Sequence, residues 1–432
     1  MRILCISPNR LSIVVPPLPI GLAAVVAAVP SRHQVRTLDF MFAADPKEQA
    51  RRVVADFAPE IIALSLRNID NQDYRHPESY IRDDKDLVQL LKELSPAPVV
   101  VGGSGFSILP REFMAYLGAD FGVAGEGEEG LREFLAAFEG SRDWAMVSGL
   151  VWRQGEEWRE NPVHRVANLE ELAPPALEYF TPHLYQEAQG SAKLPGMIPV
   201  QTRRGCPMKC IYCTTPLLEG CGIRAWPPQQ VAAWLQDWHE RLGLSRFYFV
   251  DNIFNHPLDY ARDLCRAIIK LGLPLEWGCL LNPAYPDREL FRLIRQAGGK
   301  MVQVGNESGS DLMLTNLGKG YGKEKVELTL ELLQEEGLPY ACFLMLGGPG
   351  ETPETVKESV ALLEKYQPQM VNLTVGIRIY PGLPLHRQAL EEGVVAPGDN
   401  LLWPHFYLAP AIREWIWEYL PGVVARHPHW IF

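Results

Sequence analysis

The stretch RRGCPMKCIYC, residues 203–213, carries Cys206, Cys210 and Cys213 at the spacing CxxxCxxC. It follows the apolar segment 198–202, a predicted strand, so the cysteines are expected on a βα loop. Three thiolates this close together can bind three irons of a cubane and leave the fourth iron without a protein ligand. A small molecule with an amine and a carboxylate can chelate that open iron. Structural zinc stays an alternative, because Cys221 is near enough in sequence to be a fourth ligand.

On the C-terminal side of this stretch, apolar segments alternate with amphipathic ones. The predicted strands are residues 198–202, 246–250, 276–280, 301–305, 341–346 and 372–379. Predicted helices between them include residues 229–242, 257–271, 287–296 and 325–336. Six βα units predict a partial (β/α)6 barrel resembling a TIM barrel, with its chemistry at the C-terminal ends of the strands.

The N-terminal side shows the same alternation. The predicted strands are residues 2–7, 34–40, 61–66, 99–102 and 121–124, and the predicted helices are residues 21–29, 46–57, 84–94, 111–117 and 130–138. Apolar strands alternating with helices predict a doubly wound, Rossmann-like α/β domain with a parallel sheet covered on both faces. Such sheets bind ligands at the carboxyl ends of their strands.

We expect four regions along the chain. They are a Rossmann-like domain over residues 1–140, a connector over 141–197, a barrel over 198–395 and an aromatic-rich helical region over 396–432. The simplest interpretation of the last region is an amphipathic helix that plugs the barrel. Its aromatic side chains could also form a wall of the substrate pocket.

Composition narrows the class of protein. Hydrophobic residues make up 47% and charged residues 22%, which is typical of a soluble globular chain. The net charge is −11 and no basic block stands out, which argues against a nucleic-acid partner. The longest apolar stretch, residues 18–29, is too short to span a bilayer, and the start lacks the features of a signal peptide. We therefore expect a cytoplasmic protein without a membrane span.

The cysteine run resembles the radical S-adenosylmethionine (SAM) superfamily, whose motif has an aromatic residue before the last cysteine, here Tyr212. The resemblance implies a [4Fe–4S] cluster on Cys206, Cys210 and Cys213. It also implies that SAM chelates the open iron and is cleaved reductively to a 5′-deoxyadenosyl radical. Segments 249–252, 304–310 and 347–352 resemble the strand ends that contact SAM in this family. The SAM-binding residues implied in this way are Tyr212, Asp251, Asn252, Glu307, Ser308, Gly347 and Gly348.

The N-terminal domain resembles cobalamin-binding domains through the segments GGSG, residues 102–105, and GEGE, residues 125–128. The layout, which covers nearly all of the chain, resembles the cobalamin-dependent radical SAM family. The sequence departs from cobalamin-binding domains in two ways. It lacks the DxHxxG motif, an absence that is common in the cobalamin-dependent radical SAM family. It also has Ser104 where Pro-His often stands. The cobalamin contacts implied by the resemblance are Ser65, Arg67, Asn68, Gly102, Gly103, Ser104, Gly125, Glu126 and Gly127.

Arg67 lies on the loop after the third predicted strand. The resemblance places this loop under the corrin, where a cation would disfavour an axial ligand to cobalt. Alternatively, Arg67 pairs with Asp70 or Asp73 and only shapes the loop. His76 is a further candidate ligand, although a lone loop histidine is more often a surface or structural residue. The domain could also be a scaffold that no longer binds cobalamin.

The resemblance implies an enzyme that transfers a methyl group to a carbon of a small-molecule or peptide-derived substrate. An external electron donor such as flavodoxin or ferredoxin is implied as well. Alternatives are a cyclase or rearrangement enzyme, a non-radical cobalamin methylase, and an iron–sulfur sensor without catalytic activity. Methylthiolation of tRNA is less favoured, because it needs an extra N-terminal cysteine triad and Cys5 is the only cysteine before Cys206.

Overall fold

The computed structural model describes residues 1–12, 15–190 and 194–432. The chain divides into two compact units. Unit 1 comprises Met1–Asn71, Glu78–Pro199 and Leu217–Glu219, and unit 2 comprises Gln72–Pro77, Val200–Pro216 and Gly220–Phe432. The described part of the expected connector therefore lies in unit 1, while its residues 191–193 lie outside the described residues.

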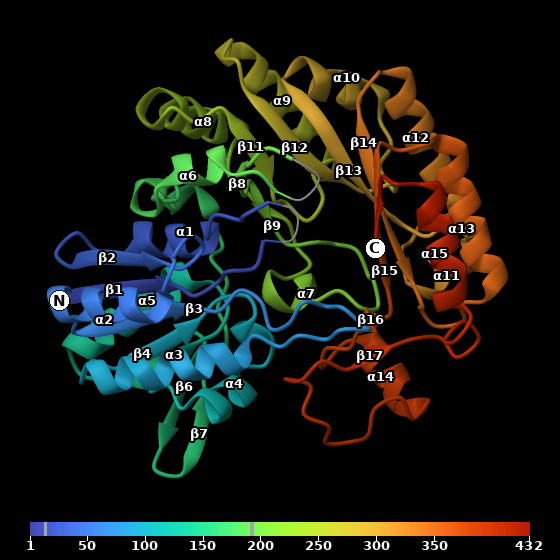
Figure 1. Cartoon of the computed structure of the whole chain (residues 1–432). Coiled ribbons are helices and arrows are strands. Elements are labelled where there is room, and N and C mark those ends of the chain that lie inside the picture. Colours follow the sequence, from blue (N-terminus) through green and yellow to red (C-terminus); the bar gives the residue numbers. More distant parts are fainter. Residues whose placement is uncertain (13–14, 191–193) are drawn as a thin grey trace. The chain divides into compact units, whose positions relative to one another are not determined.

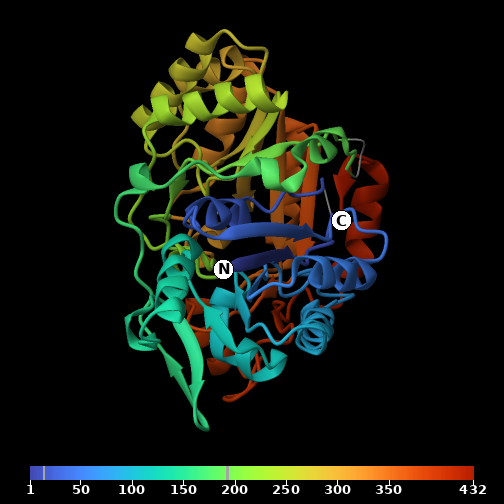
Figure 2. The ribbon, with the colours of Figure 1, turned by 90° about the vertical axis from the view of Figure 1, so that its left-hand side faces the viewer.

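Unit 1 is built on a seven-stranded sheet of order β2-β1-β3-β4-β5-β6-β7. The strands are β1 (Arg2–Ser7), β2 (Gln34–Asp39), β3 (Ile61–Ser65), β4 (Val99–Gly102), β5 (Phe121–Val123), β6 (Leu150–Gln154) and β7 (Glu157–Glu160). The strands β1 to β5 pair in parallel, and the β6–β7 hairpin continues the sheet in antiparallel pairing. Figures 1 and 2 show this hairpin projecting from unit 1. The order places a topological switch point between β1 and β3.

Helices cover both faces of this sheet. They are α1 (Ile20–Ala28), α2 (Pro46–Phe57), α3 (Ile81–Leu94), α4 (Pro110–Leu117) and α5 (Gly127–Glu139), with α6 (Pro182–Glu187) further along the chain. Helix α1 packs with α5, and α3 packs with both α2 and α4. Residues 3–7 of β1 are all buried, as expected for a central strand with helices on both sides. The Rossmann-like prediction is confirmed.

Unit 2 is built on a second sheet, of order β18-β15-β14-β13-β12-β11-β8. The strands are β8 (Ile198–Val200), β11 (Arg246–Phe249), β12 (Glu276–Leu281), β13 (Gly299–Glu307), β14 (Tyr340–Leu346), β15 (Met370–Val375) and β18 (Trp430–Ile431). Strands β11 to β15 and β18 pair in parallel. Within the described residues β8 and β18 are the two edges, so the sheet is an open, partial barrel as predicted.

The remaining elements of unit 2 surround this sheet. The longer helices are α8 (Pro228–Leu242), α9 (Leu258–Leu271), α10 (Arg288–Gln296), α12 (Lys323–Glu335), α13 (Pro353–Tyr366) and α15 (Ile416–Arg426). The shorter elements are α7 (Thr215–Leu218), α11 (Asp311–Asn316), α14 (Pro384–Glu391), β9 (Arg203–Arg204), β10 (Arg224–Ala225), β16 (Ile377–Arg378) and β17 (Phe406–Tyr407). Figure 1 shows α9, α10, α12 and α13 along the outer side of the sheet.

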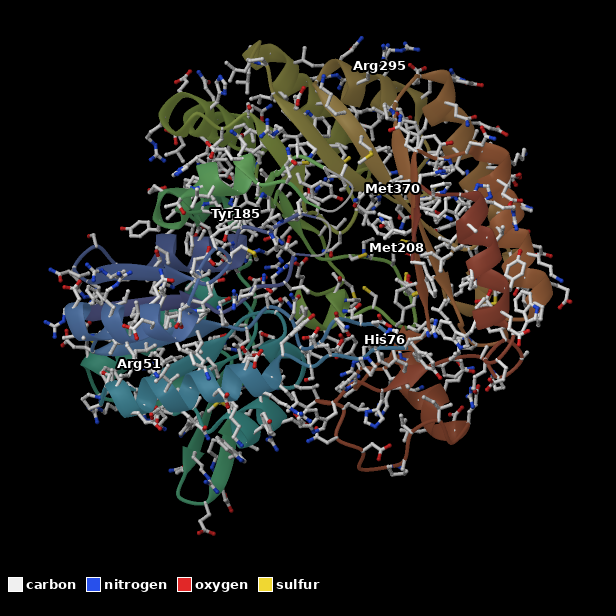
Figure 3. All side chains as sticks on the ribbon, viewed as in Figure 1. Arg51, His76, Tyr185, Met208, Arg295 and Met370 are labelled. Atoms are coloured by element: carbon white, nitrogen blue, oxygen red, sulfur yellow. The ribbon has the colours of Figure 1, made fainter. Side chains whose placement is uncertain are left out.

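The two faces of the second sheet differ in exposure. Phe247 of β11 packs against Trp238 of α8, with ring centroids 6.3 Å apart. The next residue, Tyr248, points to the opposite, inner face and donates a hydrogen bond to the Gln303 side chain of β13. In Figure 3, Arg295 lies at the outer edge of unit 2 and Met370 on the inner side of the strands. The inner face also keeps accessible side chains, since Thr374 of β15 is exposed.

The predicted strand at residues 372–379 is interrupted. Gly376 has φ 82°, so β15 ends at residue 375 and the chain continues as β16, which pairs with β17. The C-terminal region, predicted as helical, contains α15 together with the short strands β17 and β18. Among the described residues, no helix has both the length and the apolar composition that a membrane crossing requires.

Candidate active site

The cysteine loop of unit 2 begins at a tightly folded glycine. Strand β9 pairs with β10, and Gly205 follows with φ 95°. A Cβ atom at Gly205 would lie 2.1 Å from the carbonyl oxygen of Gly222, so only glycine fits there. The backbone N–H of Cys206 donates to the carbonyl of Gly220 over 3.1 Å. These contacts fix the start of the loop.

The thiols of Cys206, Cys210 and Cys213 influence one another. Cys206 is buried and the other two are partly buried, whereas Cys221 is exposed. Burial raises the pKa of Cys206 to about 11, and the other two thiols contribute to this increase. Within the described residues, no three ligating side chains gather around a single ion position. Three cysteines on one loop, whose thiols act electrostatically on one another, fit a [4Fe–4S] cluster, because a cubane binds each cysteine through a different iron.

Asp251, at the end of β11, holds the segment that precedes the cysteines. Its carboxylate accepts hydrogen bonds from the backbone N–H and hydroxyl of Thr202 (2.7 and 2.5 Å) and from the N–H of Arg203 (3.0 Å). It also forms an ion pair with the Arg203 guanidinium at 2.9 Å, and the two side chains are only 1% and 3% exposed. The SAM contact of Asp251 stays a prediction, but the geometry commits its carboxylate to the loop. Asn252 is partly exposed and accepts a hydrogen bond from Thr215.

A buried lysine, to which the sequence motifs did not point, lies beside the cysteines. Lys319 is 4% exposed, and its Nζ is 3.3 Å from the Tyr212 hydroxyl and 3.4 Å from Glu307 Oε1. Burial alone would lower the pKa of Lys319, but Glu307 and the neighbouring tyrosines raise it well above its usual value. Its charge in turn counteracts the increase in the pKa of Cys206 and Cys210 that burial causes. A fixed positive charge therefore acts on the thiols of Cys206 and Cys210.

Two glycines place this lysine. Gly318 and Gly320 have φ values of 70° and 72°, so the chain turns sharply on both sides of Lys319. A Cβ atom at Gly318 would lie 2.6 Å from the carbonyl oxygen of Lys209 in the cysteine loop. The available signal in the sequence was the pattern LGKG, residues 317–320.

Glu307, the last residue of β13, has a strained backbone. Its φ is 59°, a left-handed conformation that costs a non-glycine residue about 1–3 kcal/mol. The pairing with β14 shifts register between Val304 and Glu307. Asn306 supports the bend, since its amide can donate to the carbonyls of Val304 and Phe343. Strain of this kind is typical of functional positions, and here it accompanies the ion pair with Lys319.

The other predicted SAM residues of unit 2 also make contacts within the fold. Ser308 is only 1% exposed, and its hydroxyl oxygen lies 3.0 Å from the hydroxyl oxygen of Ser359 in α13. The Gly347 N–H donates to the buried Glu351 carboxylate over 2.8 Å, and burial raises the pKa of Glu351 to about 7. A side chain at Gly347 or Gly348 would press on neighbouring atoms. Their SAM contacts remain predictions.

In unit 1, the predicted glycines allow close packing of the strand ends. A Cβ atom at Gly103 would lie 2.6 Å from the Leu66 carbonyl oxygen, and one at Gly125 would lie 2.4 Å from the Val163 side chain. The Ser107 hydroxyl, which was not predicted, donates to the Gly103 carbonyl and accepts from the Gly125 N–H. It thereby joins the loops after β4 and β5.

The remaining predicted cobalamin residues surround the same end of the sheet. Ser65 and Gly102 are register partners on β3 and β4. Glu126 accepts from the N–H of Val166 over 2.8 Å, and Gly127 is the first residue of α5. All of them lie at the carboxyl ends of parallel strands, where doubly wound sheets bind ligands.

Arg67 lies beside the switch point of the sheet. Its side chain is solvent-accessible, yet partial desolvation by the protein around it lowers its pKa. Its backbone carbonyl accepts from the Ser104 hydroxyl, and the Asn68 amide donates to Asn9 after β1. Within the described chain the guanidinium forms no ion pair. The alternative in which Arg67 pairs with Asp70 or Asp73 is therefore wrong. His76, the other candidate near cobalt, has a side chain that is 79% exposed.

Two known families match this chain. The radical SAM superfamily matches residues 200–363, which contain the cysteine loop, Asp251 and Lys319. The B12 binding domain matches residues 7–135, which contain Arg67 and the glycines of the strand ends.

Individual proteins match over most of the chain. It is 24% identical to an uncharacterized methyltransferase of Pyrococcus horikoshii, over 87% of this chain and 79% of that protein. It is also 24% identical to tryptophan 2-C-methyltransferase of Streptomyces laurentii, over 90% and 74%. The structure of the methyltransferase TsrM from Kitasatospora setae with cobalamin and a [4Fe–4S] cluster bound has a TM-score of 0.85 at 21% identity, covering 100% of this chain and 92% of TsrM. At that identity the likeness shows a shared fold.

Proposed function

Because the chain belongs to the cobalamin-dependent radical SAM family, we propose that it methylates a carbon atom of a small or peptide-derived molecule. Its cofactors are a [4Fe–4S] cluster, SAM and cobalamin. When bound, these groups supply an electron, the methyl group and the methyl carrier. The observation that carries the proposal is a cysteine loop with a buried cation in the same chain as a cobalamin-type sheet whose Arg67 is unpaired among the described residues.

In this proposal Cys206, Cys210 and Cys213 bind three irons as thiolates. Asp251 and Arg203 are positioning residues, because their buried pair fixes the chain just before the first cysteine. Lys319 offsets part of the negative charge that three thiolates and a cluster would bring into a buried site.

SAM is held by groups around the cysteine loop. We assign its contacts to Tyr212, Asn252, Glu307 and the backbone at Gly347 and Gly348. The support is that Tyr212 and Glu307 are both tied to Lys319, so their orientations are fixed before a ligand binds. The buried hydroxyl of Ser308 instead contacts α13 and would act on SAM only through the backbone bend.

Cobalamin is held at the carboxyl ends of β1, β3, β4 and β5. We place Arg67 beneath the corrin, because its guanidinium is accessible and has no ion-pair partner among the described residues. A cation there would disfavour a protein donor to the cobalt. The Ser104 hydroxyl fixes the Arg67 backbone, which is the contribution we assign to that residue.

The substrate is an organic molecule small enough to meet the inner face of the unit 2 sheet. This face presents the Tyr248–Gln303 pair and the exposed Thr374, a mixture of apolar and hydrogen-bonding groups. The net charge of −11 argues against a nucleic acid. We propose that a flavodoxin or ferredoxin supplies the electron and that the protein acts in the cytoplasm.

The test is anaerobic purification of the full chain, reconstitution of its cluster, addition of hydroxocobalamin, and a SAM turnover assay. Retained corrin absorbance with formation of both S-adenosylhomocysteine and 5′-deoxyadenosine supports radical methylation. S-adenosylhomocysteine alone indicates a non-radical methylase, and 5′-deoxyadenosine alone with corrin bound indicates a cyclase or rearrangement enzyme. A variant with all three motif cysteines changed to alanine is the control. A cluster without SAM turnover would refute the proposal and leave an iron–sulfur sensor.

A further inference from the structure

A recess of about 640 Å³ lies at one edge of the unit 1 sheet. Its lining includes Pro98, which directly precedes β4, and Asp120, which directly precedes β5, so the recess is at the amino ends of these two strands. The ends of α3 and α4 and the β6–β7 hairpin (Figure 1) complete the lining. The predicted cobalamin residues Gly102 and Gly125 lie at the opposite, carboxyl ends of β4 and β5. The recess is therefore distinct from the predicted cobalamin site.

Two charged residues of the lining neutralise each other. The Lys92 ammonium donates to the Asp120 carboxylate over 2.7 Å and to the Gly118 carbonyl over 3.1 Å. The second carboxylate oxygen of Asp120 accepts from the Val99 N–H over 2.8 Å. Because both charges are satisfied within the fold, this pair shapes the recess and leaves little net charge for a ligand.

Three tryptophan side chains give the recess rigid aromatic walls. Trp144 stacks on Phe134 of α5 at 5.5 Å and 16° and lies 4.9 Å from the Phe121 ring. Trp152 of β6 is the register partner of Phe121, and Trp158 lies on β7. All three tryptophans line the recess and are only partly buried. Indole rings held in this way offer planar apolar surface to an aromatic ligand.

The lining also carries hydrogen-bond donors that no protein acceptor uses. Arg153 is exposed, and its guanidinium lies 5.4 Å over the ring of Trp158, its register partner. Among the described residues the Arg153 side chain forms neither a hydrogen bond nor an ion pair. Within the same part of the chain, the indole N–H groups of the three tryptophans donate to no acceptor either. An unpaired cation with surplus donors is complemented by an anion rich in acceptors.

We propose that this recess binds a small aromatic carboxylate. The ring of the ligand packs on the indole walls, and its carboxylate accepts hydrogen bonds from the Arg153 guanidinium. The volume lies within the range of roughly 300–1,000 Å³ that is typical of small-molecule sites. The inference goes beyond the proposed function and does not depend on it, because the residues that line the recess all belong to unit 1 and are not cobalamin candidates.

The experiment measures binding of 1-naphthoate to the full chain by isothermal titration calorimetry. Two further probes separate the parts of the ligand, since 1-naphthamide keeps the ring without the charge and cyclohexanecarboxylate keeps the charge without the aromatic ring. The variants are Arg153→Gln and Trp158→Leu. Arg159→Gln is the matched control, because Arg159 is on the same hairpin but pairs with Glu157 at 2.9 Å and does not line the recess. The titration is repeated with hydroxocobalamin present, and a melting curve identifies any variant that fails to fold.

The expected result is 1-naphthoate binding that is about tenfold weaker in Arg153→Gln and about three- to tenfold weaker in Trp158→Leu. Arg159→Gln and added hydroxocobalamin should leave the affinity unchanged, and the two other probes should bind more weakly than 1-naphthoate.

The absence of 1-naphthoate binding at millimolar concentration overturns the inference, as does equal affinity in Arg153→Gln and Arg159→Gln. Equal binding of 1-naphthamide overturns the role of Arg153. Loss of binding in the presence of hydroxocobalamin places the ligand in the cofactor site, which overturns the inference and leaves the proposed function standing. If Trp158→Leu does not fold, Arg153→Gln decides the question alone.

Discussion

Replacing Asp251 by asparagine removes the negative charge that faces Arg203 and keeps the size of the side chain. The asparagine oxygen can still accept hydrogen bonds from the backbone N–H groups of Thr202 and Arg203. The Arg203 guanidinium, only 3% exposed, would lose its counter-charge. Removing one partner of a buried ion pair costs about 3–5 kcal/mol, because the remaining charge stays desolvated.

This cost predicts a large change in melting temperature. In a domain of roughly 150–250 residues, each 1 kcal/mol shifts the melting temperature by about 2–4 °C, so Asp251→Asn should melt about 6–20 °C lower. We also expect fewer irons per chain after reconstitution, since the pair fixes the start of the cysteine loop. Calorimetry of the full chain and an iron assay measure the two effects.

The matched control is Asp263→Asn. Asp263 pairs with Arg266 at 3.0 Å in the same unit, but the two side chains are 54% and 52% exposed. An exposed pair contributes about 0–1 kcal/mol, so this variant should melt within about 4 °C of the unaltered protein. Equal melting temperatures and equal iron contents for the two variants would show that the Asp251 pair does not hold the loop.

Three further predictions concern other parts of the molecule. Lys319→Met should lower the reduction potential of the reconstituted cluster by about 60 mV, which is a tenfold change in the reduced-to-oxidised ratio, while Lys319→Arg should retain the potential. The potentials are measured by redox titration followed by EPR. An unchanged potential in Lys319→Met would contradict the electrostatic role of Lys319. Burial raises the pKa of Asp84 to about 8, so the folded chain holds this proton more tightly than the unfolded chain and stability is lost as pH rises from about 4 to about 8. Asp84→Asn should therefore raise the free energy of unfolding at pH 8 by at most about 5 kcal/mol and leave it unchanged near pH 4, which melting curves at the two pH values measure. Equal gains in stability at both pH values would refute this. Gly103→Ala should lower stability and hydroxocobalamin affinity more than Gly118→Ala does. Gly103 has φ 101° and its Cβ would lie 2.6 Å from Leu66, whereas Gly118 has φ 70° and its Cβ would meet nothing within 4 Å. Equal losses in the two variants would argue against close packing at Gly103.

The sequence was sufficient where a short pattern carries the information. The spacing of Cys206, Cys210 and Cys213 is local, and the alternation of apolar strands and helices follows from burial of a parallel sheet on both faces. These patterns predicted the fold class, and the resemblance of the motifs to known proteins predicted the family. The boundaries of the four expected regions remain predictions. The roles of the individual SAM and cobalamin residues remain predictions.

The features that the sequence did not predict depend on contacts between distant segments. Lys319 is buried, and next to it the Ile211 N–H donates to the Leu317 carbonyl over 3.1 Å, a contact that joins the LGKG turn to the cysteine loop. The apolar pattern at residues 372–379 gave no sign that Gly376 leaves room for a ring from Tyr74. Asp251 was recognisable as an acidic strand end, but not as the counter-charge of Arg203.

The β6–β7 hairpin has a practical consequence. Strand β7 is an edge of its sheet among the described residues, and its charged residues Glu157, Arg159 and Glu160 discourage a strand of another molecule from adding to it. At the turn, Gly155 has φ 65° and open space around it. A peptide epitope or fluorescent module inserted after Gly155 would therefore disturb little of the packed core. The turn offers an attachment point for immobilising the enzyme in an anaerobic flow cell.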